Sequence, residues 1–233
     1  MQALPHSSYQ ILVLGCAKHH PMAKLYFRYA AMNAGKSTEL LKDAHNYQER
    51  GLAVRLFTAK IDTRAGEGEI LSRLGLRRQG EWFDEATDFD EVLSRPQPSP
   101  QINLPGTVEA AGRPGATSAA PPRPDCVFID EAQFLTPAQV LQLHRHAHLQ
   151  GVPIMCYGLR SDFLGQAFPG AAALLTLADS LEELKTICAC KKKASMNTRR
   201  DASGLRMTRG AQVQIGGNES YLAVCPACFY KDL

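Results

Sequence analysis

The chain contains 233 residues, of which 45% are apolar and 21% are charged, and its formal net charge is +3. This length and composition predict a globular protein with one main domain and a small additional lobe. The net charge is too small to indicate a nucleic-acid or membrane partner, and no apolar run is long enough to span a bilayer.

Residues 1–21 are predicted to be a disordered N-terminal extension. The apolar run at residues 11–17 is followed rather than preceded by basic residues, which is not the order found in a secretory signal. Met22 stands directly before the first convincing strand, so the working protein is expected to begin there rather than at Met1. An odd number of cysteines, seven, without a signal pattern predicts a reducing, cytoplasmic location.

A phosphate-binding loop is predicted where an apolar strand at 24–29 gives way to a helix at 36–50. Backbone N–H groups in such a loop surround phosphate oxygens at the helix N-terminus, Lys36 neutralises the outer phosphates of ATP, and the Ser37 hydroxyl binds Mg²⁺. The chain departs from the pattern G-x-x-x-x-G-K-[ST] at Ala30, which is acceptable where φ stays negative. A chance Gly-Lys-Ser sequence is the alternative. The predicted ATP-binding residues of this loop are Ala30, Ala31, Met32, Asn33, Ala34, Gly35, Lys36, Ser37 and Thr38.

A second core strand at 53–58 leads into a loop that carries Asp62 and Arg64. The carboxyl ends of parallel strands meet at one edge of a sheet, so these two residues are expected to reach the metal ion and the transferring phosphate. A surface ion pair is the alternative interpretation. A short strand near Trp82 and a short helix at 88–93 are predicted to follow.

Residues 96–124 are rich in proline, glycine and alanine and are predicted to form a disordered insertion. Such a segment buries too little apolar surface to offset the entropy of ordering it. A docking segment for a partner is the alternative.

A third core strand at 126–130 ends in the acidic pair Asp130 and Glu131. Beside a phosphate loop, Asp130 is expected to help hold Mg²⁺. Glu131 is expected to take the proton of the attacking group, which is water in a hydrolase and a substrate hydroxyl in a kinase. Ala132 and Gln133 complete the predicted nucleotide-binding segment. A solvated strand end is the alternative.

A helix is predicted to begin at Thr136, because Thr136, Pro137 and Gln139 have the order of a capped N-terminus. It is expected to end near Gly151 and to lead into a buried strand at 153–158. Strands that alternate with helices predict an α/β fold, a mostly parallel sheet with helices on both faces, over residues 22–184.

Four cysteines form two close pairs near the C-terminus and predict a structural zinc site in a small zinc-ribbon-like lobe at 185–233. Four thiolates would close the tetrahedral shell of Zn²⁺ and leave no position for substrate. Disulfides or unpaired thiols are the alternatives. The basic residues of this lobe, Arg199 among them, are expected to lie on a solvated surface. The predicted zinc ligands are Cys188, Cys190, Cys225 and Cys228.

Six separated segments together resemble the zinc-containing, type II thymidine kinases. The resemblance spans residues 22–95 and 125–231, and agreement across so many segments is more specific than any single motif. The segments are 31–38, 46–51, 129–134, 156–163, 184–188 and 215–221.

The resemblance implies transfer of the γ-phosphate of ATP to the 5′-hydroxyl of thymidine, with Mg²⁺ as catalytic cofactor, Zn²⁺ as structural cofactor and Glu131 as general base. Arg64 is the candidate arginine for stabilising the transition state. The resemblance further implies a homotetramer inhibited by dTTP and a role in thymidine salvage, and neither a nucleic-acid nor a membrane partner is expected. The residues implied to line the nucleoside pocket are Met32, Phe134, Leu159, Phe163, Phe168, Gly216 and Tyr221.

Two other functions use the same motifs. A phosphate-loop ATPase with a nucleic-acid-binding zinc ribbon would employ Glu131 to activate water instead of a hydroxyl. A non-catalytic nucleotide-binding scaffold would bind ATP without turnover. The breadth of the resemblance favours the kinase.

Overall fold

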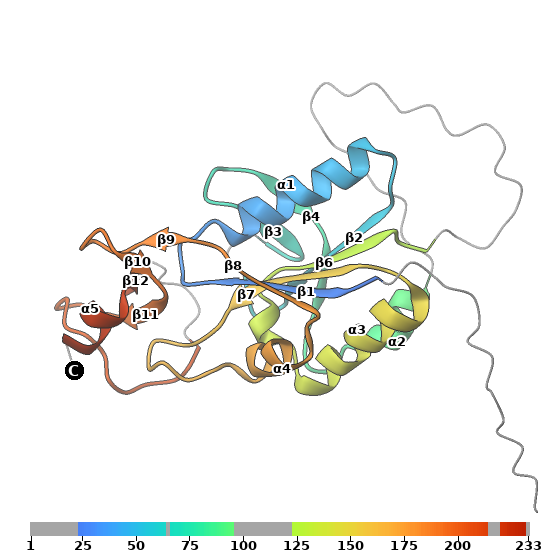
Figure 1. The fold of residues 1–233 in the computed structure, drawn as a ribbon. Coiled ribbons are helices and arrows are strands. Elements are labelled where there is room, and N and C mark those ends of the chain that lie inside the picture. The colour runs from blue at the N-terminus through green and yellow to red at the C-terminus, as the bar shows by residue number, and fades with distance from the viewer. Residues whose placement is uncertain (1–22, 64–65, 96–122, 214–219, 232–233) are drawn as a thin grey trace, which may run out of the picture.

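A central sheet of six strands organises the molecule. In this computed structural model, which describes residues 23–63, 66–95, 123–213 and 220–231, the strand order is β5-β2-β6-β7-β1-β8 (Figure 1). Neighbouring strands of this sheet pair in parallel throughout. The strands are β1 (Leu25–Ala30), β2 (Val54–Ala59), β5 (Glu81–Phe83), β6 (Cys126–Ile129), β7 (Ile154–Leu159) and β8 (Ser180–Glu183).

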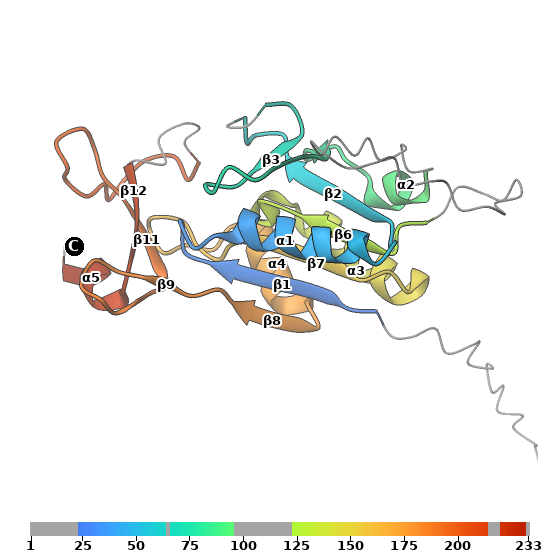
Figure 2. The same cartoon turned by 90° about the horizontal axis from the view of Figure 1, so that it is seen from above.

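Helices cover both faces of the sheet, and for this reason its central strands are buried. All residues of β2 and β6 are buried, as expected for strands packed on two sides. One helix, α1, lies on one face, and α2, α3 and α4 lie on the other (Figures 1 and 2). The helices are α1 (Lys36–Glu49), α2 (Phe89–Ser94), α3 (Pro137–Gln150) and α4 (Pro169–Leu177).

Strands β1, β6 and β7 end at the same edge of the sheet. Phe27 of β1 and Ile129 of β6 both pair with Cys156 of β7. The segments that follow β1 and β6 therefore emerge on the two sides of β7. In a parallel sheet this carboxyl edge is where ligands bind, and here it gathers the loop after β1 and the acidic pair after β6.

The N-terminus of α3 has the capping box that the sequence predicts. The Thr136 hydroxyl accepts a hydrogen bond from the backbone N–H of Gln139 (3.2 Å), and the Gln139 side-chain oxygen accepts one from the backbone N–H of Thr136 (2.9 Å). Pro137 occupies the first helical position, where a missing N–H has no cost.

A close contact fixes α4 against the short 3₁₀ helix η1 (Ala132–Phe134). A Cβ atom on Gly170 would lie 2.3 Å from the carbonyl oxygen of Leu135 and 2.8 Å from that of Gln133. Only glycine permits this approach. The N-terminus of α4 thus supports the segment that follows the acidic pair.

A small lobe lies beyond the carboxyl edge of the sheet (Figures 1 and 2). It contains two antiparallel strand pairs, β9 with β10 and β11 with β12, and a short helix. A separate hairpin, β3 with β4, packs beside α1. These elements are β3 (Glu69–Leu71), β4 (Arg77–Gln79), β9 (Thr186–Ile187), β10 (Lys193–Ala194), β11 (Met196–Arg199), β12 (Tyr221–Val224) and α5 (Pro226–Lys231).

The predicted α/β fold with a small four-cysteine lobe is confirmed. The helix predicted at 36–50 spans Lys36–Glu49, and the helix predicted from Thr136 spans Pro137–Gln150. Helix α4 and the edge strand β8 had no counterpart among the predicted elements. The predicted extension at 1–21 and most of the predicted insertion, 96–122, lie outside the described residues. Among the helices described, none combines the length and apolar composition needed to cross a membrane.

Candidate functional site

The phosphate loop turns sharply between β1 and α1. Asn33 (φ +64°) and Gly35 (φ +79°) adopt left-handed conformations, and α1 begins directly after Gly35. Ala30 is the last residue of β1, and its φ is not positive, so the alanine in place of the motif's first glycine causes no backbone strain. The loop therefore has the turn at a helix N-terminus that a phosphate-binding site needs.

The Lys36 side chain folds back over this loop. Its ammonium group lies 3.4 Å from the carbonyl oxygen of Ala31, and the residue is buried. A buried ammonium beside a turn of backbone N–H groups gives this loop a positive polarity, which is suited to a polyphosphate.

Asp130 meets the phosphate loop from the end of β6. The Ser37 hydroxyl hydrogen-bonds its buried carboxyl group. Burial, followed by the charge of Glu131, raises the pKa of Asp130 to about 7, although Ser37 and Lys36 act in the opposite direction. Asp130 is buried, while Glu131 and Ser37 are partly exposed. Two adjacent carboxyl groups and a hydroxyl are a donor set that fits Mg²⁺.

Glu131 is held in an uncommon backbone conformation. Its φ of +50° is left-handed, and its backbone N–H donates to the Asp130 carboxylate (3.0 Å). Its side-chain Oε2 accepts a hydrogen bond of 2.6 Å from Nε2 of Gln133. Non-glycine residues in the left-handed region are strained, and they often cluster at active sites and ligand-binding sites.

Gln133 connects Glu131 with the end of β7. While its amide nitrogen donates to Glu131, its amide oxygen accepts a hydrogen bond from the backbone N–H of Leu159 (2.9 Å). Gly158 allows this contact, because a Cβ there would lie 2.8 Å from the same amide oxygen. The orientation of the predicted base is therefore set by two strands, β6 and β7.

The predicted nucleoside-pocket residues fall into two groups. Phe134, Phe168 and Leu159 pack at the edge of the main core, with the two phenyl rings in an edge-on contact of 5.8 Å. Phe163, fully buried, and Tyr221 lie around Arg199 of the small lobe. Asp62 lies on the loop after β2, while Arg64 and Gly216 fall outside the described residues.

Arg199 is buried, which corrects its predicted place on a solvated basic surface. Its guanidinium carbon lies 3.9 Å from the centroid of the Phe163 ring. The same group donates hydrogen bonds to the carbonyl oxygen of Ala211 (3.0 Å) and to the Tyr221 hydroxyl (3.2 Å). Counting charges in the sequence could not separate this arginine from its exposed neighbours.

Two polar residues that the sequence interpretation missed join the lobe to the sheet. Asn197 Oδ1 accepts a hydrogen bond from the backbone N–H of Met32 (2.7 Å), and its Nδ2 donates to the carbonyl oxygen of Ser161 (2.9 Å). Gln212 donates to the buried carboxylate of Asp162 (3.0 Å). No sequence pattern distinguishes these residues, because their partners are distant along the chain.

The four predicted zinc ligands come together in the small lobe. The sulfur atoms of Cys188, Cys190, Cys225 and Cys228 all lie within 4.8 Å of one another, and the cysteines are free of disulfides. Backbone N–H groups of Cys190 and Cys225 lower the pKa of Cys188 to about 6, which favours a thiolate. This sulfur cluster is consistent with a tetrahedral zinc site.

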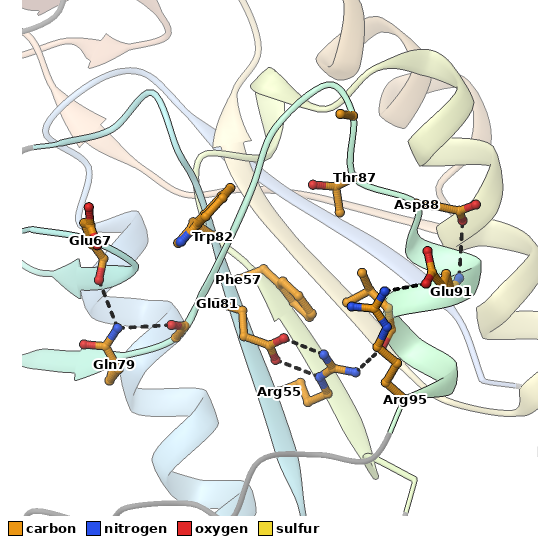
Figure 3. Close-up of a pocket in the computed structure, with 13 residues that line it drawn as sticks. Arg55, Phe57, Glu67, Gln79, Glu81, Trp82, Thr87, Asp88, Glu91 and Arg95 are labelled. Carbon is orange, nitrogen blue, oxygen red and sulfur yellow. Dashed lines mark hydrogen bonds and ion pairs between the residues drawn. The ribbon is translucent and has the colours of Figure 1, made fainter.

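A cavity of about 700 Å³ lies elsewhere, at the β5–β2 margin of the sheet (Figure 3). Arg55 lies within it, but both sides of its guanidinium are already engaged, by Glu81 (2.6 and 2.8 Å) and by the carbonyl oxygen of Val92 (2.6 Å). None of the predicted site residues lines this cavity. The candidate site is the carboxyl edge of the sheet, where the phosphate loop meets the acidic pair.

Several known proteins that are similar to this chain in sequence are thymidine kinases. The family model described as thymidine kinase matches residues 23–99 and 117–229. The thymidine kinase of Albidiferax ferrireducens is 53% identical over 212 residues, which cover 91% of this chain and 94% of that protein. The thymidine kinases of Chromobacterium violaceum and Ruegeria pomeroyi are 47% and 50% identical over 211 and 204 residues. These alignments cover 91% and 88% of this chain, and 100% and 92% of the relatives.

Proposed function

Because the chain belongs to the thymidine kinase family, we propose how its own residues carry out the transfer of phosphate from ATP to thymidine. The activity itself is ATP-dependent phosphorylation of thymidine. The single observation that carries the mechanism is the meeting of the phosphate loop with the acidic pair, through Ser37 and Asp130, at the carboxyl ends of β1 and β6.

Glu131 acts as the general base. A primary hydroxyl is a weak nucleophile, and a carboxylate within hydrogen-bond reach accepts its proton as the bond to phosphorus forms. The proton moves from the 5′-hydroxyl of thymidine to a Glu131 carboxylate oxygen. The hydrogen bond from Gln133 supports this role, because it fixes the carboxylate without protonating it.

The phosphate loop and Lys36 bind the transferring phosphate. In phosphoryl transfer the protein mainly positions the reactants and stabilises the charge on the equatorial oxygens. Ser37 and Asp130 would hold Mg²⁺, which would supply positive charge to offset the negative charge of the phosphates. The raised pKa of Asp130 supports this assignment, since a buried acidic pair is stabilised by a nearby cation.

The nucleoside pocket is formed between the sheet and the small lobe. Met32, Phe134, Leu159, Phe163, Phe168 and Tyr221 supply apolar and aromatic walls, and Gly216 belongs to the segment that covers the nucleoside. Such walls exclude water, which favours transfer to the hydroxyl over hydrolysis of ATP. The buried position of Phe163 under Arg199 supports a rigid wall on the lobe side.

The four cysteines bind a structural Zn²⁺ that fixes the small lobe. Four sulfur ligands fill a tetrahedral shell and leave no open position for catalysis. The division of the chain into a kinase domain at 22–184 and a zinc lobe at 185–233 follows from this assignment.

The remaining proposals, on Asp62, Arg64, the oligomeric state and inhibition by dTTP, rest on similarity to the family and not on contacts in the structure. Asp62 and Arg64 contact the metal ion and the transferring phosphate, with Arg64 stabilising the transition state. The enzyme is a cytoplasmic homotetramer that dTTP inhibits. Size-exclusion chromatography with light scattering tests the tetramer. Rate measurements with added dTTP test the inhibition.

The experiment that tests the proposal is transfer from γ-labelled ATP with Mg²⁺ to thymidine, to the other deoxynucleosides and to no acceptor. Selective formation of thymidine monophosphate is the expected result. Equal consumption of ATP without an acceptor would instead indicate the phosphate-loop ATPase.

A further inference from the structure

A second cluster of side chains of the types that bind metal ions lies at the amino edge of the sheet, opposite the edge that carries the phosphate loop and the acidic pair. It consists of His144 and His148, one turn apart on α3, and Asp179, which directly precedes β8. Their ligand atoms all lie within 4.8 Å of one another. Figure 1 shows α3 and α4 on the same face of the sheet, and the two helices pack against each other.

The spacing of these atoms suits a single transition-metal ion. His148 Nε2 lies 3.1 Å from both carboxylate oxygens of Asp179, and the two imidazole rings lie 4.5 Å apart between centroids. Zinc bonds to nitrogen and oxygen are about 2.0–2.2 Å long, so ligand atoms of one ion are roughly 3–3.5 Å apart. Small side-chain rotations bring the three residues to that geometry.

The carboxylate is already oriented for this role. Asp179 Oδ2 accepts a hydrogen bond of 2.8 Å from the backbone N–H of Leu25, the first residue of β1. A ligand held from behind by a backbone N–H is typical of functional metal sites.

A simple ion pair explains only part of the arrangement. His148 alone could pair with Asp179, and only when protonated. That ion pair does not involve His144, whose ring lies 4.5 Å from the ring of His148 between centroids. Two imidazoles and one carboxylate at the same point, still open to solvent, form a ligand set that binds zinc, nickel or copper ions.

We propose that His144, His148 and Asp179 form a surface site for a divalent transition-metal ion of the zinc class, with water completing the coordination shell. The bound ion connects α3 to the α4–β8 junction. Through the Asp179–Leu25 hydrogen bond it also reaches the beginning of β1. The site differs from the four-cysteine cluster in its ligands and in its open coordination positions.

The test is calorimetric titration of the full chain, its cysteine site saturated with Zn²⁺, using Ni²⁺ as the probe because Ni²⁺ favours imidazole ligands. The variants are His144→Gln, His148→Gln and Asp179→Asn. The matched control is His146→Gln, because residues two apart on a helix do not share a face. His19 and His20 remain in every variant and contribute equally.

We expect the unmodified chain and the His146→Gln control to bind one equivalent of Ni²⁺ that His144→Gln does not bind, or binds at least tenfold more weakly. Ni²⁺ should also raise the melting temperature of these two proteins but not that of the three site variants. His144→Gln removes no hydrogen bond that holds the fold, so it remains informative if Asp179→Asn is unstable. Equal Ni²⁺ binding by all the proteins would overturn the proposal.

Discussion

Arg199 lies over the ring of Phe163, with 3.9 Å between the guanidinium carbon and the ring centroid. The contact joins a buried cation of the small lobe to a wall of the proposed nucleoside pocket. Arg199 also bonds Ala211 and Tyr221, so one side chain holds both ends of the segment between them. Its proposed role is to position the pocket, because its described contacts are with Phe163, Ala211 and Tyr221.

Replacing this cation should weaken nucleoside binding selectively. Arg199→Met removes the hydrogen bonds to the carbonyl oxygen of Ala211 and to the Tyr221 hydroxyl, each worth roughly 0.5–1.5 kcal/mol. We expect kcat/KM for thymidine to fall at least tenfold while the KM for ATP changes little. Steady-state kinetics with each substrate varied in turn check this. Arg209→Met, at an exposed position of the same lobe, is the control and should behave like the unmodified enzyme.

Glu131→Gln should lower kcat at least a hundredfold, in line with the roughly 10²–10⁴-fold contribution of general-base catalysis. The amide keeps the size of the side chain but cannot accept the proton of the hydroxyl. Single-turnover rates with labelled ATP, together with nucleotide binding measured by fluorescence titration, separate the two effects. Near-normal turnover would remove Glu131 from its role, and a parallel loss of ATP binding would indicate a general disturbance of the site.

Cys225→Ser should release zinc and reduce the affinity for thymidine. Strand β12 ends directly before Cys225, and it pairs with β11, which carries Arg199 and Asn197. Loss of the zinc site therefore removes the support of the pocket as well as that of the lobe. Elemental analysis and thymidine titration measure both consequences. Cys16→Ser, outside the proposed ligand set, should keep its zinc, and unchanged zinc content in Cys225→Ser would rule out the four-cysteine site.

Gly170→Ala should destabilise the protein by overpacking. The added Cβ would lie 2.3 Å from the carbonyl oxygen of Leu135, so α4 or η1 must move at a cost of about 1–3 kcal/mol. Urea unfolding measures the difference. Ala172→Ser, at an exposed position of the same helix, controls for changes in helix propensity. An unchanged unfolding midpoint would show that the contact relaxes without cost.

The Asp179 carboxylate should stabilise the fold in a pH-dependent way even without added metal. Its pKa is lower in the folded chain, so its contribution is present above the carboxyl pKa of the unfolded chain, about 4, and is lost as pH falls through the folded value. Asp179→Asn should therefore be less stable than the unmodified chain at pH 7, with the difference shrinking below pH 4. Unfolding midpoints measured across this range check the sign. A difference that grows on acidification would contradict it.

Local patterns were sufficient for much of the fold. The capped start of α3 depends on Thr136 and Gln139, three residues apart, and the phosphate loop depends on a short segment between β1 and α1. Each of these signals depends on residues that are close together in the sequence, so the sequence alone predicts them. The two cysteine pairs were also recognisable in the sequence, because their spacing is typical of a tetrahedral zinc site.

What the sequence did not reveal depends on distant partners. Edge strand β8 is short and half exposed, so it lacks the apolar run by which β2 and β6 were predicted. Arg199 is buried only because Phe163, Ala211 and Tyr221 surround it. His144, His148 and Asp179 come together through the packing of α3 on α4, which no single segment encodes.

Asn197 makes the phosphate loop and the zinc lobe structurally inseparable. It is the acceptor for the Met32 N–H and the donor to the Ser161 carbonyl. A fragment that ended at residue 184 would lose both hydrogen bonds, because Asn197 lies beyond that boundary. Trimming the chain there should therefore disturb the proposed phosphate loop, since one of its backbone N–H groups is bonded by a residue from the other side.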